Sequence, residues 1–175
     1  MKQLFFISAF LILTLSLLKA SDGYQVQFNQ PQNNVYELTF DLGDFNLSTE
    51  THDGVIYSKI IFDHSIFTNL KGFAELPYIH ATVQLSPGKN VDLQIIESDY
   101  TDYNLDYPLL PSRGTIYRDQ DPSGIPYHVD PGSITDKLYP EYLAKDTEPF
   151  IIKDIRGTSV YVYPFKINSN HNNHI

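Results

Sequence analysis

The sequence contains no cysteine. This excludes a disulfide framework, a lipid-attachment cysteine, a thiol nucleophile and a thiolate metal site within the chain. Tryptophan is absent too, and basic residues are scarce: 12 Lys and Arg stand against 21 Asp and Glu, for a formal net charge of −9. Because such a surface repels phosphate backbones and anionic lipid, we expect neither a nucleic-acid partner nor a membrane-surface partner.

Long apolar runs are also rare, and the one present lies at the start of the chain, from Leu4 to Leu18. Lys2 precedes it and the small residue Ala20 follows it, which predicts a signal peptide over residues 1–20 and an exported protein, periplasmic, cell-surface or extracellular. A permanent N-terminal anchor is the alternative, although about 15 apolar residues are short for a bilayer span of roughly 20. After cleavage we expect a soluble chain, free of the membrane.

Sequence motifs for catalysis are missing: there is no GxSxG, HExxH, phosphate-cradling glycine loop or DxDxDG loop. His171 and His174 form an HxxH in a polar tail, and Asp99, Asp102 and Asp106 lie close enough in sequence to chelate calcium. A solvated tail and solvent-facing carboxylates are the simpler interpretations. The remaining histidines before the tail, His52, His64, His80 and His128, stand singly. We therefore predict no enzyme activity, no cofactor and no metal site.

Strand-like patterns dominate what is present. Polar and apolar residues alternate over residues 25–29, 35–40 and 91–95, and β-branched and aromatic runs occupy residues 55–62, 78–85 and 159–163. Turn residues separate them, at Asp53–Gly54, Lys71–Gly72, Ser86–Gly88, Pro131–Gly132 and Arg156–Gly157. Only residues 137–146 suggest a helical turn. The pattern predicts an all-β fold, an antiparallel β-sandwich with little or no helix, formed as a single domain by residues 21–167 and followed by a polar, flexible tail, residues 168–175.

Aromatic side chains are abundant, with 13 Tyr and 11 Phe. One interpretation is a sandwich face that stacks on sugar rings, as in carbohydrate-binding or adhesion modules. The other is the ordinary packing of a β core, which the lack of Trp favours.

Two of the three arginines in the chain lie in the stretch PSRGTIYRDQDPSGIPY, residues 111–127. Proline residues 111, 122 and 126 limit the freedom of this segment, so it loses less entropy on docking. A planar guanidinium binds a carboxylate through two hydrogen bonds, and truncating one partner of such a buried pair costs about 2–5 kcal/mol. An Arg next to Asp119 can equally make a local surface pair with Asp119 or Asp121, worth about 0–1 kcal/mol.

Further pieces in the same order carry a resemblance: ELP at 75–77, the 111–127 block, LYP at 138–140, and PFIIKDIRG followed by VYVYPFKIN. Over these pieces the chain resembles the propeptides of gingipain-type cysteine peptidases, secreted Arg- or Lys-specific proteases of Bacteroidetes-like bacteria. The resemblance implies a β-sandwich prodomain without a catalytic domain, which keeps a protease latent by laying a loop across its active site and assists its folding. The partner would be the catalytic domain of such a protease, in cis or in trans.

In this family a basic side chain after the PS(K/R)G motif occupies the primary specificity pocket, and here that position is Arg118. The resemblance thus implies an inhibitory loop that contains Ile116, Tyr117, Arg118 and Asp119, with Arg113 supporting the turn or touching the rim of the cleft. We expect Arg156 to be structural, paired with Asp154 or a neighbouring strand. A gingipain-type precursor continues into a further strand, a processing site and the protease, so the chain is expected to be a truncated precursor, a non-functional remnant or a stand-alone inhibitor.

Overall fold

The computed structural model describes residues 23–168, so the predicted signal peptide and all but the first residue of the predicted tail lie outside the described residues. Within this part the helical elements are two three-residue 3-10 turns, η1 (Pro122–Gly124) and η2 (Pro131–Ser133). No helix among the described residues is long and apolar enough to cross a membrane.

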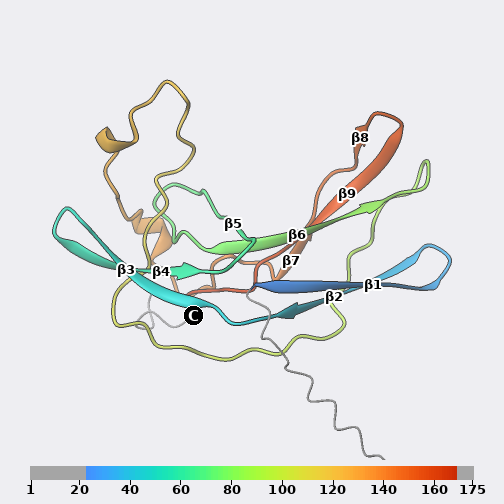
Figure 1. Cartoon of the computed structure of the whole chain (residues 1–175), viewed down its shortest axis with the longest axis horizontal. Helices are drawn as coiled ribbons and strands as arrows, with labels where there is room; N and C mark the ends of the chain where they lie inside the picture. Colours follow the sequence, from blue (N-terminus) through green and yellow to red (C-terminus); the bar gives the residue numbers. More distant parts are fainter. Residues whose placement is uncertain (1–22, 169–175) are drawn as a thin grey trace, which may run out of the picture.

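Within residues 23–168, nine strands form two layers (Figure 1). One layer holds two hairpins, β1 (Tyr24–Gln32) with β2 (Val35–Leu42), and β3 (Asn46–His52) with β4 (Val55–Ile61). The other is a five-stranded sheet of β5 (Ile66–Phe67), β6 (Pro77–Gln84), β9 (Ile155–Val162), β7 (Ala144–Asp146) and β8 (Phe150–Ile152), in which β7 and β8 both pair with β9. All of these strand pairs are antiparallel. The predicted antiparallel β-sandwich is confirmed.

Short turns set the register of the hairpins. Asp53 and Gly54 separate the paired residues His52 and Val55, and their φ angles are 50° and 79°. Positive φ at both central residues is what a two-residue type I′ turn requires, and Asp-Gly adopts it readily. The sequence therefore fixes the β3–β4 register at this turn.

Three expectations from the sequence are wrong. Residues 91–95 form no strand, despite their alternation, and belong to an extended segment, residues 86–107, that runs along the hairpin layer (Figure 1). Residues 137–146 form no helical turn, because Tyr139 exchanges two backbone hydrogen bonds with Ile167 and the segment ends in β7. Arg156–Gly157 lies inside β9, and the β8–β9 turn is instead at residues 153–154.

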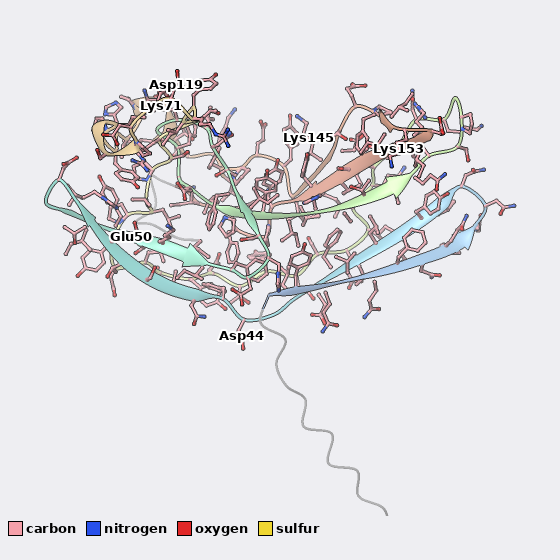
Figure 2. All side chains as sticks on the ribbon, turned by 45° about the horizontal axis from the view of Figure 1, so that its top comes forward. Asp44, Glu50, Lys71, Asp119, Lys145 and Lys153 are labelled. Atoms are coloured by element: carbon pink, nitrogen blue, oxygen red, sulfur yellow. The ribbon has the colours of Figure 1, made fainter. Side chains whose placement is uncertain are left out.

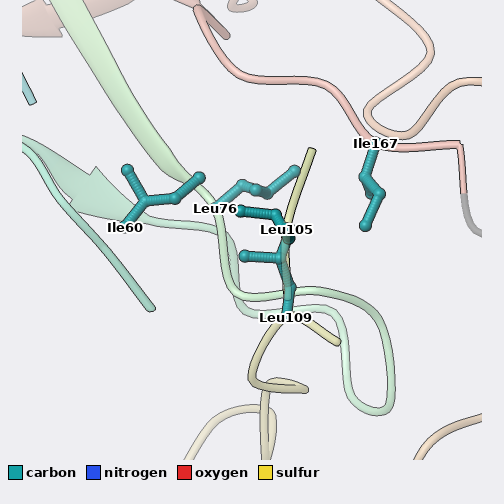
Figure 3. Packing of buried hydrophobic residues seen from close by; sticks show 5 residues of the cluster. All are labelled: Ile60, Leu76, Leu105, Leu109 and Ile167. Carbon is teal, nitrogen blue, oxygen red and sulfur yellow. The ribbon is translucent and has the colours of Figure 1, made fainter. Parts of the chain in front are cut away.

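The hydrophobic core gathers residues from distant parts of the chain (Figure 3): Ile60, Leu76, Leu105, Leu109 and Ile167. Ile60 and Leu76 are fully buried. Phe165 packs edge-on against Phe45 and Phe62, with ring centroids 5.0 and 5.5 Å apart. By contrast, no residue of β1 or β2 is buried. Two members of this core, Leu105 and Leu109, lie directly before the arginine-containing segment.

Candidate functional site

The arginine-containing segment leaves the core through a fixed entry. Leu110 donates its N–H to the carbonyl of Ser58 on β4 (2.9 Å) and accepts from the N–H of Glu75 (2.8 Å). Ser112 then donates to the carbonyl of Phe73 (2.7 Å). The backbone of this short stretch is thus paired on both sides, which anchors the chain before it turns outward.

Gly72 holds both ends of the loop that follows, residues 113–129, which we call the arginine loop. Its N–H donates to the carbonyl of Ser112 (2.8 Å), and its carbonyl accepts from the N–H of Asp130 (3.0 Å). Gly72 has φ +81°, and a Cβ placed on it would lie 2.6 Å from the Asp130 Cβ and 2.7 Å from its nitrogen. Only glycine fits this position without displacing Asp130.

Arg113 braces the loop internally. Its Nη1 donates to the carbonyls of Pro122 (2.6 Å) and Ile125 (3.5 Å), and its guanidinium lies 4.7 Å from the ring centroid of Tyr127. The two carbonyls belong to the far side of the loop, so Arg113 connects its entry to its return. Arg113 thus supports the turn within the loop, while a contact of Arg113 with the rim of a protease cleft stays a prediction.

A closed turn lies at residues 117–120. The N–H of Gln120 donates to the carbonyl of Tyr117 (3.0 Å), and the Gln120 side-chain Oε1 accepts from the N–H of Tyr117 (2.9 Å). Arg118 and Asp119 are the two central residues, and neither has a positive φ. Asp119 lies at the outer side of the molecule, at the same end as Lys71 (Figure 2). Arg118 is therefore presented at the corner of a turn that is clamped by both backbone and side chain.

The Arg118 side chain is exposed and forms no hydrogen bond or ion pair with residues 23–168. The expected local alternative, a pair with Asp121, is not formed: both carboxylate oxygens of Asp121 accept from Ser123, one from its N–H (2.9 Å) and one from its Oγ (2.7 Å). These hydrogen bonds, the side-chain one first, lower the pKa of Asp121. Asp119 is exposed as well and makes no ion pair with Arg118. The guanidinium is thus available to a partner.

The flanking positions differ in exposure. Tyr117 is 65% exposed, whereas Ile116 is only partly exposed. Asn69 contacts the loop next to them, because its Nδ2 donates to Thr115 Oγ1 (3.3 Å). The structure therefore brings Ile116, Tyr117, Arg118 and Asp119 together at the outer part of one braced loop.

A ring contact and two hydrogen bonds connect the arginine loop to the β3–β4 hairpin. Tyr127 lies against His52, with ring centroids 4.1 Å apart, and His52 Nε2 donates to Glu50 (3.0 Å). Glu50 also accepts from Lys59 Nζ (3.0 Å). The hydrogen bond from His52, followed by that from Lys59, lowers the pKa of Glu50. Together with Arg113 on Tyr127, these contacts fix the return of the loop against the hairpin.

Glu75 lies on the segment that pairs with the loop entry. Its carboxylate is half-buried and forms no hydrogen bond or ion pair with the described residues. Burial raises its pKa, and the largest opposing influence is the charge of Lys59. Burial therefore disfavours the ionised form of Glu75, which lies next to the loop entry.

The third arginine lies elsewhere. Arg156 donates to the carbonyls of Ser86 (3.4 Å) and Lys89 and to the Asn90 Oδ1 (3.2 Å). It therefore fastens the turn that follows β6 to β9, which is a structural role as expected, although its partners are this turn and not Asp154.

The other candidates from the sequence that lie within the described residues do not assemble into a site. Asp99, Asp102 and Asp106 are exposed on the extended segment, and no group of three metal-ligating side chains occurs within residues 23–168. His171 and His174 lie outside the described residues. A shallow, open groove runs beside the arginine loop and is lined by His52, Asp53, Arg113, Pro122 and Tyr127 among others.

Sequence reasoning missed Gly72, Gln120 and Asp130. Lys71–Gly72 was expected only as a turn, and nothing in the sequence indicates that this glycine contacts a residue 58 positions later. Asp130 precedes Pro-Gly, and its side chain accepts from the Gly132 N–H (2.7 Å), so Asp-Pro-Gly was a readable sign that the loop ends there.

Comparison with known proteins identifies the domain. The model of the Propeptide_C25 family matches residues 19–173. The chain belongs to this family. It is thus a gingipain-type propeptide domain, as the sequence resemblance indicated, and not a catalytic domain.

Among curated relatives, the propeptide domain is 29% identical over 98 residues to gingipain R1 of Porphyromonas gingivalis, which is 56% of this chain and 10% of the relative. It is 28% identical over 129 residues to gingipain R2 of strain W83, 71% of this chain and 17% of the relative. The chain therefore spans a small fraction of the length of these relatives.

Two solved structures share the fold. The first is a complex of Porphyromonas gingivalis RgpB pro- and mature domains, with a TM-score of 0.77 and 22% identity over 86% of this chain and 78% of that one. The second concerns the zymogenic latency of gingipain K, also from Porphyromonas gingivalis, with a TM-score of 0.74 and 13% identity over 88% and 87% of the two chains.

Proposed function

We propose that this propeptide domain binds and masks the active site of a gingipain-type cysteine protease, with Arg118 in the primary specificity pocket as a substrate mimic. The observation that carries the proposal is the presentation of Arg118: an exposed guanidinium without a partner in the described chain, at the corner of a clamped turn. Ile116, Tyr117 and Asp119 flank it at the contact, while Arg113 acts behind it as a brace.

Related structures support this partner. One neighbour is a pro- and mature-domain complex of RgpB, and the other is described in terms of zymogenic latency of gingipain K. A guanidinium favours a protease that cleaves after Arg, because its fork geometry matches a carboxylate at the base of a pocket. The same interface would serve in cis, within a precursor, or in trans, after export, and would also support folding of the protease.

The energetic expectation follows from the unpaired state of Arg118. Docking forms a charge-assisted pair without first breaking one within the domain, and the internal hydrogen bonds of the loop reduce the entropy lost on binding. Removing one partner of such a pair costs about 2–5 kcal/mol, which is about 30-fold to several thousand-fold in affinity.

The test is a titration of the purified protein against mature gingipain R2, following hydrolysis of a small Arg substrate. Arg118→Ala should weaken inhibition by at least about 30-fold. Arg156→Ala is the matched control, because it removes the same charge and the same side chain at a structural position and should leave inhibition within about threefold of wild type.

Each other outcome has a defined meaning. A cooperatively folding wild type that inhibits nothing would overturn the proposal and leave the secreted adhesion or carbohydrate-binding module, or a non-functional precursor remnant. Equal loss in both arginine variants would show that general charge or stability, and not pocket filling, controls binding.

A further inference from the structure

A peptide that places an arginine in the specificity pocket of an Arg-specific protease is ordinarily a substrate. We propose that Gln120 is the residue that keeps the arginine loop from being cleaved, because its side chain holds Arg118 in a closed turn. This inference rests on the proposed function, and it concerns the fate of the Arg118–Asp119 bond after docking.

The turn removes the backbone groups that a protease uses. Extended peptides are bound as an added strand, through hydrogen bonds from their own N–H and C=O groups. Here the carbonyl of Tyr117 accepts from Gln120 N–H, and the N–H of Tyr117 donates to Gln120 Oε1. Both polar groups of the residue before Arg118 are therefore already engaged within the loop.

The chain after Arg118 is equally far from extended. Asp121 caps the 3-10 turn η1 by accepting from Ser123 N–H, and the Pro122 carbonyl accepts from Arg113. Residues 117–120 and 121–124 thus form two successive hydrogen-bonded turns that meet at Asp121. A productive substrate geometry requires the reacting atoms to be aligned, and a run of turns opposes that alignment.

Among the residues that make these contacts, Gln120 is the one whose side chain can be removed with the fewest other hydrogen bonds lost. Gln120 is exposed and its only hydrogen bonds among the described residues lie within this turn. Asp121 and Arg113, by comparison, also hold η1 and Tyr127. Without Oε1, the Tyr117 N–H is free and the turn is held by one backbone hydrogen bond.

Opening the turn makes hydrolysis possible. One water adds across the Arg118–Asp119 amide: its oxygen bonds to the Arg118 carbonyl carbon, the C–N bond breaks, and a proton passes to the leaving nitrogen of Asp119. The cut loop would then no longer be held as one braced unit, so inhibition would decay with time.

The experiment compares wild type, Gln120→Ala and Gln120→Glu, with melting temperatures checked first. Glu retains an acceptor oxygen for the Tyr117 N–H, so it is the conservative variant, whereas Ala removes it. Each protein is exposed in its native state to trypsin, and the cut after Arg118 is followed by mass spectrometry. Gln120→Ala should be cut at this bond roughly tenfold faster than wild type, the factor that loss of one hydrogen bond produces, and Gln120→Glu should resemble wild type.

A second arm uses mature gingipain R2. Wild type should inhibit and stay intact, while inhibition by Gln120→Ala should decay as fragments ending at Arg118 appear. If Gln120→Ala is cut no faster than wild type by either protease, the inference is wrong even when wild type inhibits. If wild type does not inhibit, the proposed function fails, and the trypsin arm still decides whether Gln120 protects the bond.

Discussion

Replacing Gly72 by alanine tests whether one residue holds both ends of the arginine loop. Gly72 has φ +81°, a region that costs an L-residue about 1–2 kcal/mol. The new Cβ would also meet the Asp130 backbone nitrogen at 2.7 Å, a distance that real Cβ atoms do not tolerate. Asp130 must therefore move.

The expected magnitude follows from these two effects. Moving Asp130 breaks its hydrogen bond to the Gly72 carbonyl, worth about 0.5–1.5 kcal/mol. Together with the backbone cost, Gly72→Ala should lower the free energy of unfolding by about 2–3 kcal/mol. For a domain of this size that corresponds to roughly 5–10 °C in melting temperature. Inhibition of gingipain R2 should weaken by about tenfold or more, because the loop exit is displaced.

Gly88→Ala is the matched control. Gly88 also has positive φ, +68°, but no heavy atom lies within 4 Å of a Cβ added there. Only the backbone cost of about 1–2 kcal/mol should appear, with inhibition unchanged. Thermal unfolding and the inhibition titration are measured on both variants. Equal effects of the two substitutions on stability and inhibition would refute the pinning of the loop at Gly72.

Two further substitutions probe the electrostatics and the far end of the domain. Glu75→Gln should raise the free energy of unfolding at pH 7 and not at pH 4. Burial raises the pKa of the Glu75 carboxyl above its ordinary 4.5. The stabilisation of the folded state by the protonated carboxyl is therefore fully present below pH 4.5 and is lost as the pH rises through the folded pKa. At pH 7 the ionised carboxyl is buried at a cost that glutamine avoids. Melting curves at both pH values check this, and an equal shift at both would exclude burial as the cause. Arg156→Ala should cost about 1–2 kcal/mol by freeing the turn after β6, seen in denaturant unfolding, and no loss would mean that its hydrogen bonds contribute nothing.

Strands were predictable where the pattern and the turn chemistry agreed. Residues 55–62 were predicted as a strand and Asp53–Gly54 as a turn, and both form, although the partner strand β3 was not predicted. Alternation alone was insufficient at residues 91–95, because a strand also needs a partner with which to share hydrogen bonds, and none of the described strands pairs with this segment. Tyr139 shows the converse: its backbone pairs with Ile167, and this pairing overrides the local preference of residues 137–146 for a helical turn.

The candidate site divides in the same way. Arg118 was identified through the resemblance, and its exposure adds the physical reason that it is available. Gly72 and Gln120 could not be identified from sequence, because their importance depends on which atoms approach them. From sequence, Gly72 indicates only a turn, because its contact with Asp130 is known only from the structure. Gln120 likewise indicates only a solvated side chain, because the hydrogen bond from Tyr117 is known only from the structure.

The uneven distribution of buried residues has a dynamic consequence. No residue of the β1–β2 hairpin is fully buried; Gly43 closes its base by donating to the Gly23 carbonyl, Tyr24 packs on Phe62, and its outer part faces β6 across an open groove. A two-stranded hairpin on its own is only marginally stable. Its amides should therefore exchange with solvent through local opening, well below the free energy of global unfolding, while those around Ile60 and Leu110 exchange only when the whole domain unfolds. We therefore expect the end of the domain that carries the arginine loop to stay folded while the β1–β2 hairpin at the opposite end opens locally.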